Sequence, residues 1–196
     1  SLQGGCPLVD VRRVAFMGVR TSDPGFQERC LEWSGAVSDR ILSERPDTVF
    51  LATFAAGETI DDGTGRSQVE QYGEAFRDRV GPWTANGTQV FIIRDTPLTL
   101  DRSTPDCLAL NSNRPLACAT DRADALPADP LVAAAHAMDD PGVKVIDLSD
   151  RFCPDDKCYA AIGGLHVFFD TDHVARSYVR SLVPLFSERF EAARAG

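Results

Sequence analysis

Short apolar runs alternate along the chain with segments in which apolar residues recur every three or four positions. The apolar runs, which we interpret as buried strands, are residues 48–53, 90–93 and 143–146. The amphipathic segments, which we interpret as helices, are residues 27–44, the stretch around Val69, Tyr72, Phe76 and Val80, residues 130–138, and a last helix that begins near Asp172. Apolar strands separated by amphipathic helices are typical of a parallel sheet covered on both faces. We therefore predict an α/β fold, a three-layer α/β/α sandwich with a parallel sheet.

The remaining segments carry weaker signals. Residues 1–25 are expected to be irregular, and residues 98–128 and 149–166 are expected to be long loops. The buried face of the first helix is expected to consist of Cys30, Trp33, Val37 and Ile41. Pro184 stands inside the last helix, where we expect it to bend the helix or remove a backbone hydrogen bond.

The composition is that of an ordinary globular protein. The 196 residues are 43% hydrophobic and 25% charged, and we predict one domain over residues 1–196. No apolar run approaches the roughly 20 residues that cross a bilayer. The net charge is −9 and no basic patch is visible, which argues against a nucleic-acid partner. The chain does not begin with Met, and we expect it to be a piece of a longer protein.

Six cysteines are the first specific signal. By proximity they form three local pairs, Cys6 with Cys30, Cys107 with Cys118, and Cys153 with Cys158. Their spacing does not fit a zinc site, which needs closer cysteines or added histidines. Disulfides are the favoured interpretation and free thiols the alternative, and disulfides indicate an oxidising, extracytoplasmic compartment.

Polar residues follow the predicted strands. Ligands of parallel α/β sheets bind in the crevice beyond the carboxyl ends of the strands. The loops 53–57, 94–97 and 147–150 open at that edge, and we expect the turn at residues 170–173 to join them.

His173 is the strongest candidate for chemistry. A carboxylate three positions earlier, Asp170, can accept a hydrogen bond from Nδ1–H of the imidazole if the segment forms a turn. Such a bond holds the tautomer in which Nε2 takes a proton. The alternative is that Asp170 or Asp172 only caps the following helix. His136 and His166 are interpreted as solvated or structural residues.

Four motifs, in this order, carry a resemblance to a known family. They are Gly5-Cys6-Pro7 followed by Cys30-x-x-Trp33, Arg94-Asp95-Thr96-Pro97, Asp147-Leu148-Ser149 leading through Cys153 to Cys158, and Phe169-Asp170-Thr171-Asp172-His173. Together they resemble the SGNH (GDSL-like) hydrolase superfamily, and more closely the SGNH domains fused to membrane acyltransferases of the acyltransferase-3 (AT3) family. The resemblance covers nearly the whole chain.

This resemblance implies roles for particular residues. His173 is the general base that activates a serine, Asp170 orients it, and Gly5 offers an oxyanion-hole N–H. The nucleophile of the superfamily lies in a Gly-Asp-Ser motif after the first strand, and the chain contains no such motif. We therefore expect an SGNH, flavodoxin-like sandwich that lacks its first strand and nucleophile block. Residues 53–57 also lack the usual Asn, and Ser22 and Ser149 are interpreted as turn residues.

The resemblance also implies a function. We expect an extracytoplasmic domain, tethered to an AT3 membrane domain of the same polypeptide in a bacterial envelope. It would transfer an acyl group, most simply acetyl, to a glycan or glycolipid through Ser-His-Asp chemistry, with no metal and no organic cofactor. The alternatives are a carbohydrate esterase and a non-catalytic glycan-binding module. Trp33 and Trp83, which could stack on sugars, are interpreted as packing residues.

Overall fold

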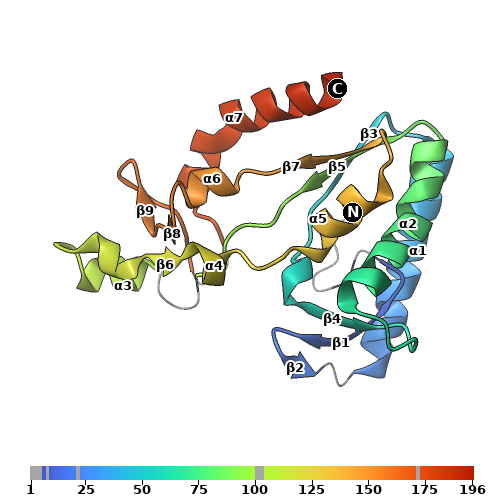
Figure 1. Cartoon of the computed structure of the whole chain (residues 1–196), viewed down its shortest axis with the longest axis horizontal. Coiled ribbons are helices and arrows are strands. Elements are labelled where there is room, and N and C mark those ends of the chain that lie inside the picture. The colour runs from blue at the N-terminus through green and yellow to red at the C-terminus, as the bar shows by residue number, and fades with distance from the viewer. Residues whose placement is uncertain (1–5, 8, 21–22, 100–103, 171–172) are drawn as a thin grey trace. The chain divides into compact units, whose positions relative to one another are not determined.

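The computed structural model describes the chain except residues 1–5, 8, 21–22, 100–103 and 171–172 (Figure 1). The chain divides into two compact units. Unit 1 consists of residues 1–95 and 128–145, and unit 2 of residues 96–127 and 146–196. A single domain over residues 1–196 stays a prediction.

A parallel sheet forms the centre of unit 1. Its strands are β3 (Thr48–Leu51), β5 (Gln89–Ile93) and β7 (Val143–Ile146), in the order β3-β5-β7. Strands β3 and β5 run parallel, with Val49 opposite Val90. The strands lie where the apolar runs predicted them, except that β3 ends two residues early. The predicted α/β fold with a parallel sheet is confirmed.

One face of this sheet carries the main core of unit 1. Helices α2 (Gln68–Ala85) and α5 (Pro130–Met138) contribute seven of the fifteen buried residues described in it. The fully buried ones from α2 are Tyr72, Phe76, Val80 and Trp83. The predicted helix over residues 130–138 is confirmed. Val69 is 53% exposed instead of buried, because it lies in the first turn of α2, ahead of the buried stripe.

Strand β3 is less buried than expected. Phe50 is 45% exposed, although its ring centroid lies 5.6 Å from that of Phe91 on β5. The expectation of a buried strand was therefore wrong for all of β3 except Leu51, and among the described residues β3 is the edge of the sheet.

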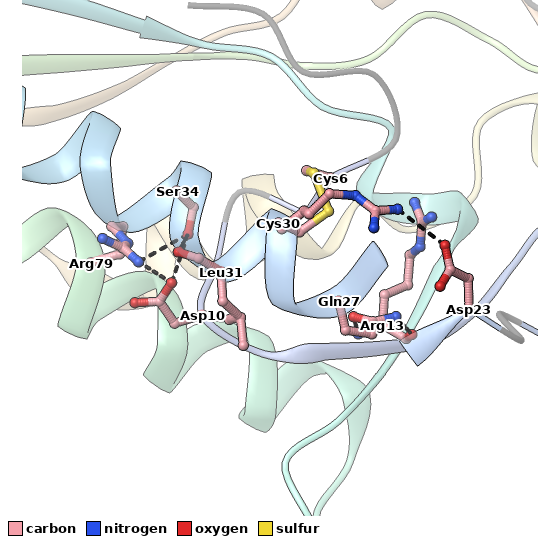
Figure 2. Close-up of a disulfide and its surroundings, with 10 residues drawn as sticks. Cys6, Asp10, Arg13, Asp23, Gln27, Cys30, Leu31, Ser34 and Arg79 are labelled. Atoms are coloured by element: carbon pink, nitrogen blue, oxygen red, sulfur yellow. Dashed lines mark hydrogen bonds and ion pairs between the residues drawn. A yellow bond between two sulfur atoms is a disulfide. The ribbon is translucent and has the colours of Figure 1, made fainter. Parts of the chain in front are cut away.

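Helix α1 (Pro24–Glu44) buries a different face from the one its apolar residues predict. Its buried side chains are Gln27, Cys30, Ser34 and Ser38. The predicted members Trp33, Val37 and Ile41 are half-buried. The reason is hydrogen bonding to α2, in which Trp83 Nε1 donates to Ser38 Oγ at 2.9 Å and Arg79 donates to Ser34 Oγ at 3.1 Å. Arg79 also forms an ion pair with Asp10, which fixes the N-terminal segment on both helices (Figure 2).

The segment expected to be irregular contains a second sheet. Strands β1 (Arg12–Phe16), β2 (Val19–Arg20) and β4 (Glu58–Asp61) form an antiparallel sheet in the order β2-β1-β4. Met17 and Gly18, both with positive φ, make the tight turn between β1 and β2. The sequence missed this sheet because β1 depends on pairing with β4, more than 40 positions away.

The two long loops of unit 2 hold short elements. Residues 98–128 contain α3 (Pro105–Leu110), η2 (Pro115–Cys118), β6 (Thr120–Asp121) and α4 (Arg122–Ala125). Residues 149–166 contain α6 (Ser149–Phe152), β8 (Lys157–Cys158), β9 (Ala161–Ile162) and β10 (Leu165–His166). Strand β6 pairs with β8, so the two segments form one small framework.

The last helix, α7 (Arg176–Ala195), begins four residues later than predicted. Residues 173–175 instead pair through backbone hydrogen bonds with residues 167–169. The helix continues through Pro184 without interruption.

All six cysteines are in disulfides, in the three predicted pairs. Cys6–Cys30 ties the N-terminal segment to α1, as Figure 2 shows. Cys107–Cys118 and Cys153–Cys158 close the two loops of unit 2.

Unit 1 also contains a buried carboxyl group. Burial raises the pKa of Glu58 to about 7, and the nearby Arg13 guanidinium opposes this effect. Its Oε2 atom is buried with no hydrogen-bond partner among the described residues. Burial and the charges of Glu58 and Asp129 in turn raise the pKa of the Tyr72 hydroxyl well above its usual value. Because Glu58 is largely buried and its Oε2 atom has no partner in the described part of the chain, folding favours the neutral form of its carboxyl group.

Glu58→Gln should flatten the pH dependence of stability. In the parent protein, the contribution of Glu58 to the free energy of unfolding is most favourable below pH 4.5. This contribution is lost as the pH rises through about 7, because the carboxyl group then loses its proton in the folded state. This shift corresponds to roughly 3 kcal/mol at most. Urea unfolding at several pH values between 5 and 8 measures how steeply the free energy of unfolding changes with pH. Glu32→Gln, on the exposed side of α1, is the control. Equal slopes in the parent and Glu58→Gln would contradict the assignment.

The disulfides predict a mass. Protein exported to an oxidising compartment and analysed without reductant should lack six hydrogens relative to the all-thiol chain, because each of the three bonds removes two. Intact-mass spectrometry before and after reduction tests this. The full thiol mass before reduction would show that the cysteines are free.

Candidate functional site

A tight turn precedes helix α7 in unit 2. Phe168 and Val174 form an antiparallel bridge. Phe169 N–H donates to the carbonyl oxygen of His173 at 2.8 Å, and Ala175 N–H donates to that of Val167 at 2.8 Å. These bonds fold the chain back on itself between residues 169 and 173.

Asp170 and His173 face each other across this turn. Nδ1 of His173 lies 3.0 Å from Oδ1 and 2.9 Å from Oδ2 of Asp170. The backbone N–H of His173 also donates to Asp170 Oδ1, at 2.7 Å. The carboxylate therefore holds both the ring and the backbone of the histidine. The His173 side chain is 72% exposed and that of Asp170 is 40% exposed.

This geometry favours one tautomer. A carboxylate is an acceptor only, so the contact places the neutral imidazole proton on Nδ1 and leaves Nε2 with a lone pair. A histidine held in this way can take a proton at Nε2, and the carboxylate then stabilises the imidazolium. The sequence pointed to the ring contact, but it missed the backbone bond, although residues three apart in a turn commonly form one.

A small aromatic core supports the turn. Phe168 is buried together with Phe152 and Tyr178, whose rings pack edge-on at 5.5 Å. Tyr178 Oη donates to the carbonyl oxygen of Arg151 at 2.5 Å, which links α7 to α6. The Cys153–Cys158 disulfide belongs to the same core. Packing and a covalent bond thus hold the backbone that carries the pair.

Helix α7 also supports the loop after β7. Arg189 donates to the carbonyl oxygen of Asp147 and pairs with Asp150 at 2.8 Å. The Arg189 hydrogen bond holds the pKa of Asp150 below its usual value. The partners are about 40 positions apart in sequence, so no local spacing could reveal this contact.

The other predicted site residues have separate outcomes. Gly5 and Ser22 lie outside the described residues. Ser149 is buried at the start of α6, where its N–H donates to Asp147 Oδ1 at 2.8 Å. His136 and His166 are exposed, on α5 and β10. The convergence of the loops 53–57, 94–97 and 147–150 stays a prediction.

No group of three metal-ligating side chains gathers in the described part of the chain. The same residues include no helix with the length and hydropathy of a membrane span.

The chain thus combines a mixed α/β fold with an Asp-x-x-His turn before its last helix. The sequence model of the family described as "SGNH domain (fused to AT3 domains)" matches residues 2–188. The chain belongs to this family.

A solved structure shares the fold. It is the periplasmic domain of a lipopolysaccharide acetyltransferase from Salmonella ser. Paratyphi A, with a TM-score of 0.60 and 14% sequence identity. The similarity covers 95% of this chain and 69% of that one. The search of curated proteins found no match.

The Asp170 contact predicts an observable tautomer. At a pH where His173 is neutral, its proton should reside on Nδ1, and Asp170→Ala should move a large fraction of it to Nε2. Nitrogen-15 NMR of the histidine rings distinguishes the two forms. The exposed ring of His166 is the internal control and should not change. An Nε2–H form of His173 in the parent protein would contradict the assigned contact.

Proposed function

We propose that the chain supplies the general base, His173, and its orienting acid, Asp170, for Ser-His-Asp acyl transfer. The observation that carries this proposal is the contact between Nδ1 of His173 and the Asp170 carboxylate, at 2.9 Å on an exposed turn. Membership of the SGNH family fused to AT3 domains supports acyl transfer as the reaction class.

The nucleophile is a serine that this chain does not provide, since it contains no Gly-Asp-Ser motif. We place it in a segment upstream of Ser1. Nε2 of His173 takes the proton of the serine hydroxyl while its oxygen attacks the carbonyl carbon of the acyl donor. The tetrahedral intermediate then expels the donor's leaving group, which takes the proton from the imidazolium. The product is an acyl-serine ester.

The second half of the reaction uses the same base. A sugar hydroxyl gives its proton to Nε2 and attacks the ester carbonyl. Collapse of the second intermediate releases the acylated sugar, and the proton returns to the serine. Backbone N–H groups would stabilise both oxyanions, and Gly5 stays a proposed donor.

The family and the cysteines support the setting that we propose. The donor would be the AT3 membrane domain of the same polypeptide, and the acceptor a glycan or glycolipid of the cell envelope. Three disulfides are typical of proteins in an oxidising compartment, which supports a location outside the cytoplasm.

Water competes with the sugar for the ester. The side chain of His173 is 72% exposed, so water can reach it, and we expect weak esterase activity. A dedicated carbohydrate esterase is therefore the second candidate function.

Labelling by a fluorophosphonate tests the proposal. In protein that includes the upstream serine, the probe should react with that serine, and His173→Ala should slow labelling by roughly 1,000-fold or more. Asp170→Asn should also slow it strongly, because the amide can hold the other tautomer. Labelling rates are read by gel fluorescence and by mass spectrometry of the modified peptide.

The matched control is His166→Ala, which removes another exposed histidine of unit 2 and should leave labelling unchanged. If His173→Ala reacts as fast as the parent, His173 is not the base. If the parent protein itself is inert, the proposed Ser-His-Asp chemistry is wrong, and a non-catalytic module is favoured instead.

A further inference from the structure

Phe169 has the most exposed aromatic ring among the described residues. It is 71% exposed, and the next, Phe50, is 45% exposed. The preceding residue, Phe168, is 1% exposed and belongs to the aromatic core of unit 2. The chain thus buries the side chain of Phe168 and leaves that of Phe169 in solvent.

A single exposed apolar residue needs no special explanation by itself, but the position of Phe169 is particular. Its backbone N–H donates to the carbonyl oxygen of His173 at 2.8 Å, and the next residue is Asp170. The ring is therefore carried by the same short turn as the Asp170–His173 pair. All three residues belong to unit 2, so their proximity does not depend on how the two units are arranged.

The fold makes little use of this ring. The backbone of Phe169 is already held by its bond to His173, and the packing of the turn is supplied by Phe168. A large apolar side chain is therefore left in solvent at the residue whose backbone pairs with that of His173, and the His173 side chain is itself 72% exposed. A ligand that brings a hydroxyl group to His173 would thus find an aromatic face next to it.

We propose that Phe169 is the platform on which the ring of the acceptor sugar lies while its hydroxyl approaches His173. This inference rests on the proposed function and names a residue that selects its acceptor. One face of a pyranose ring carries C–H bonds, which are apolar and slightly positive. Such a face fits the negative face of an aromatic ring, and aromatic side chains dominate the energy of many binding surfaces. Water and glycerol offer hydroxyl groups without such a face.

Sugar binding can be measured without the nucleophile. The probes are methyl β-D-glucopyranoside and methyl β-D-galactopyranoside, with glycerol as the polyhydroxy control. NMR titration of protein labelled in its phenylalanine and histidine rings should move the signals of Phe169 and His173 with at least one of the two glycosides, and not with glycerol.

Substitutions of Phe169 distinguish stacking of the sugar on an aromatic ring from contact with any apolar side chain. Phe169→Ala and Phe169→Leu should weaken glycoside binding about tenfold, since both remove the ring. Phe169→Tyr should keep the parent affinity, because it restores the ring. Leu110→Ala is the matched control, an apolar side chain of unit 2 that is 86% exposed, and should bind as the parent does. The melting temperatures of all these variants should agree, because the side chains that they change are exposed.

Three results would overturn the proposal that Phe169 binds the sugar ring. They are no glycoside binding by the parent protein, unchanged binding by Phe169→Ala, and full affinity in Phe169→Leu. The failure of the proposed function is distinguishable from these, because fluorophosphonate labelling needs no sugar and the titration needs no serine.

Discussion

The hydrogen-bonded turn between Asp170 and His173 is the constraint on which the functional interpretation depends. One carboxylate binds both the ring and the backbone N–H of the histidine, so the imidazole has a fixed tautomer and a fixed direction. This arrangement requires that helix α7 begin at Arg176 rather than near Asp172. The intervening residues are then available to pair with Phe168 and Phe169, and the turn closes around the pair.

The surroundings of the turn explain how an exposed pair can still be held in place. Phe168, Phe152 and Tyr178 form a compact core beneath it, and the Cys153–Cys158 disulfide closes that core. The side chains of Asp170 and His173 are exposed to solvent, while the backbone that carries them is held by this core. The proposed acyl transfer would need this combination, because a sugar would have to reach His173 and the imidazole would have to keep its orientation.

Unit 1 combines an apolar core with buried polar contacts. Helices α1 and α2 meet through serine hydroxyls, and Arg79 joins Ser34 and Asp10. Arg79 Nη2 has these partners, whereas Arg79 Nε and the Oε2 atom of Glu58 are buried with no hydrogen-bond partner among the described residues. The fold therefore stabilises the neutral form of Glu58, which makes the stability of unit 1 sensitive to pH near neutrality.

The sequence by itself determined the features that depend on neighbours along the chain. These are the strands at 90–93 and 143–146, the helix at 130–138, the cysteine pairs and the Asp-x-x-His spacing. Contiguous apolar runs and short spacings carry such information directly. Only the tertiary structure decided the polar buried face of α1, the antiparallel sheet of the N-terminal segment and the late start of α7. Each of these depends on a hydrogen-bond partner or pairing that the local apolar pattern does not reveal, in the first two cases tens of residues away.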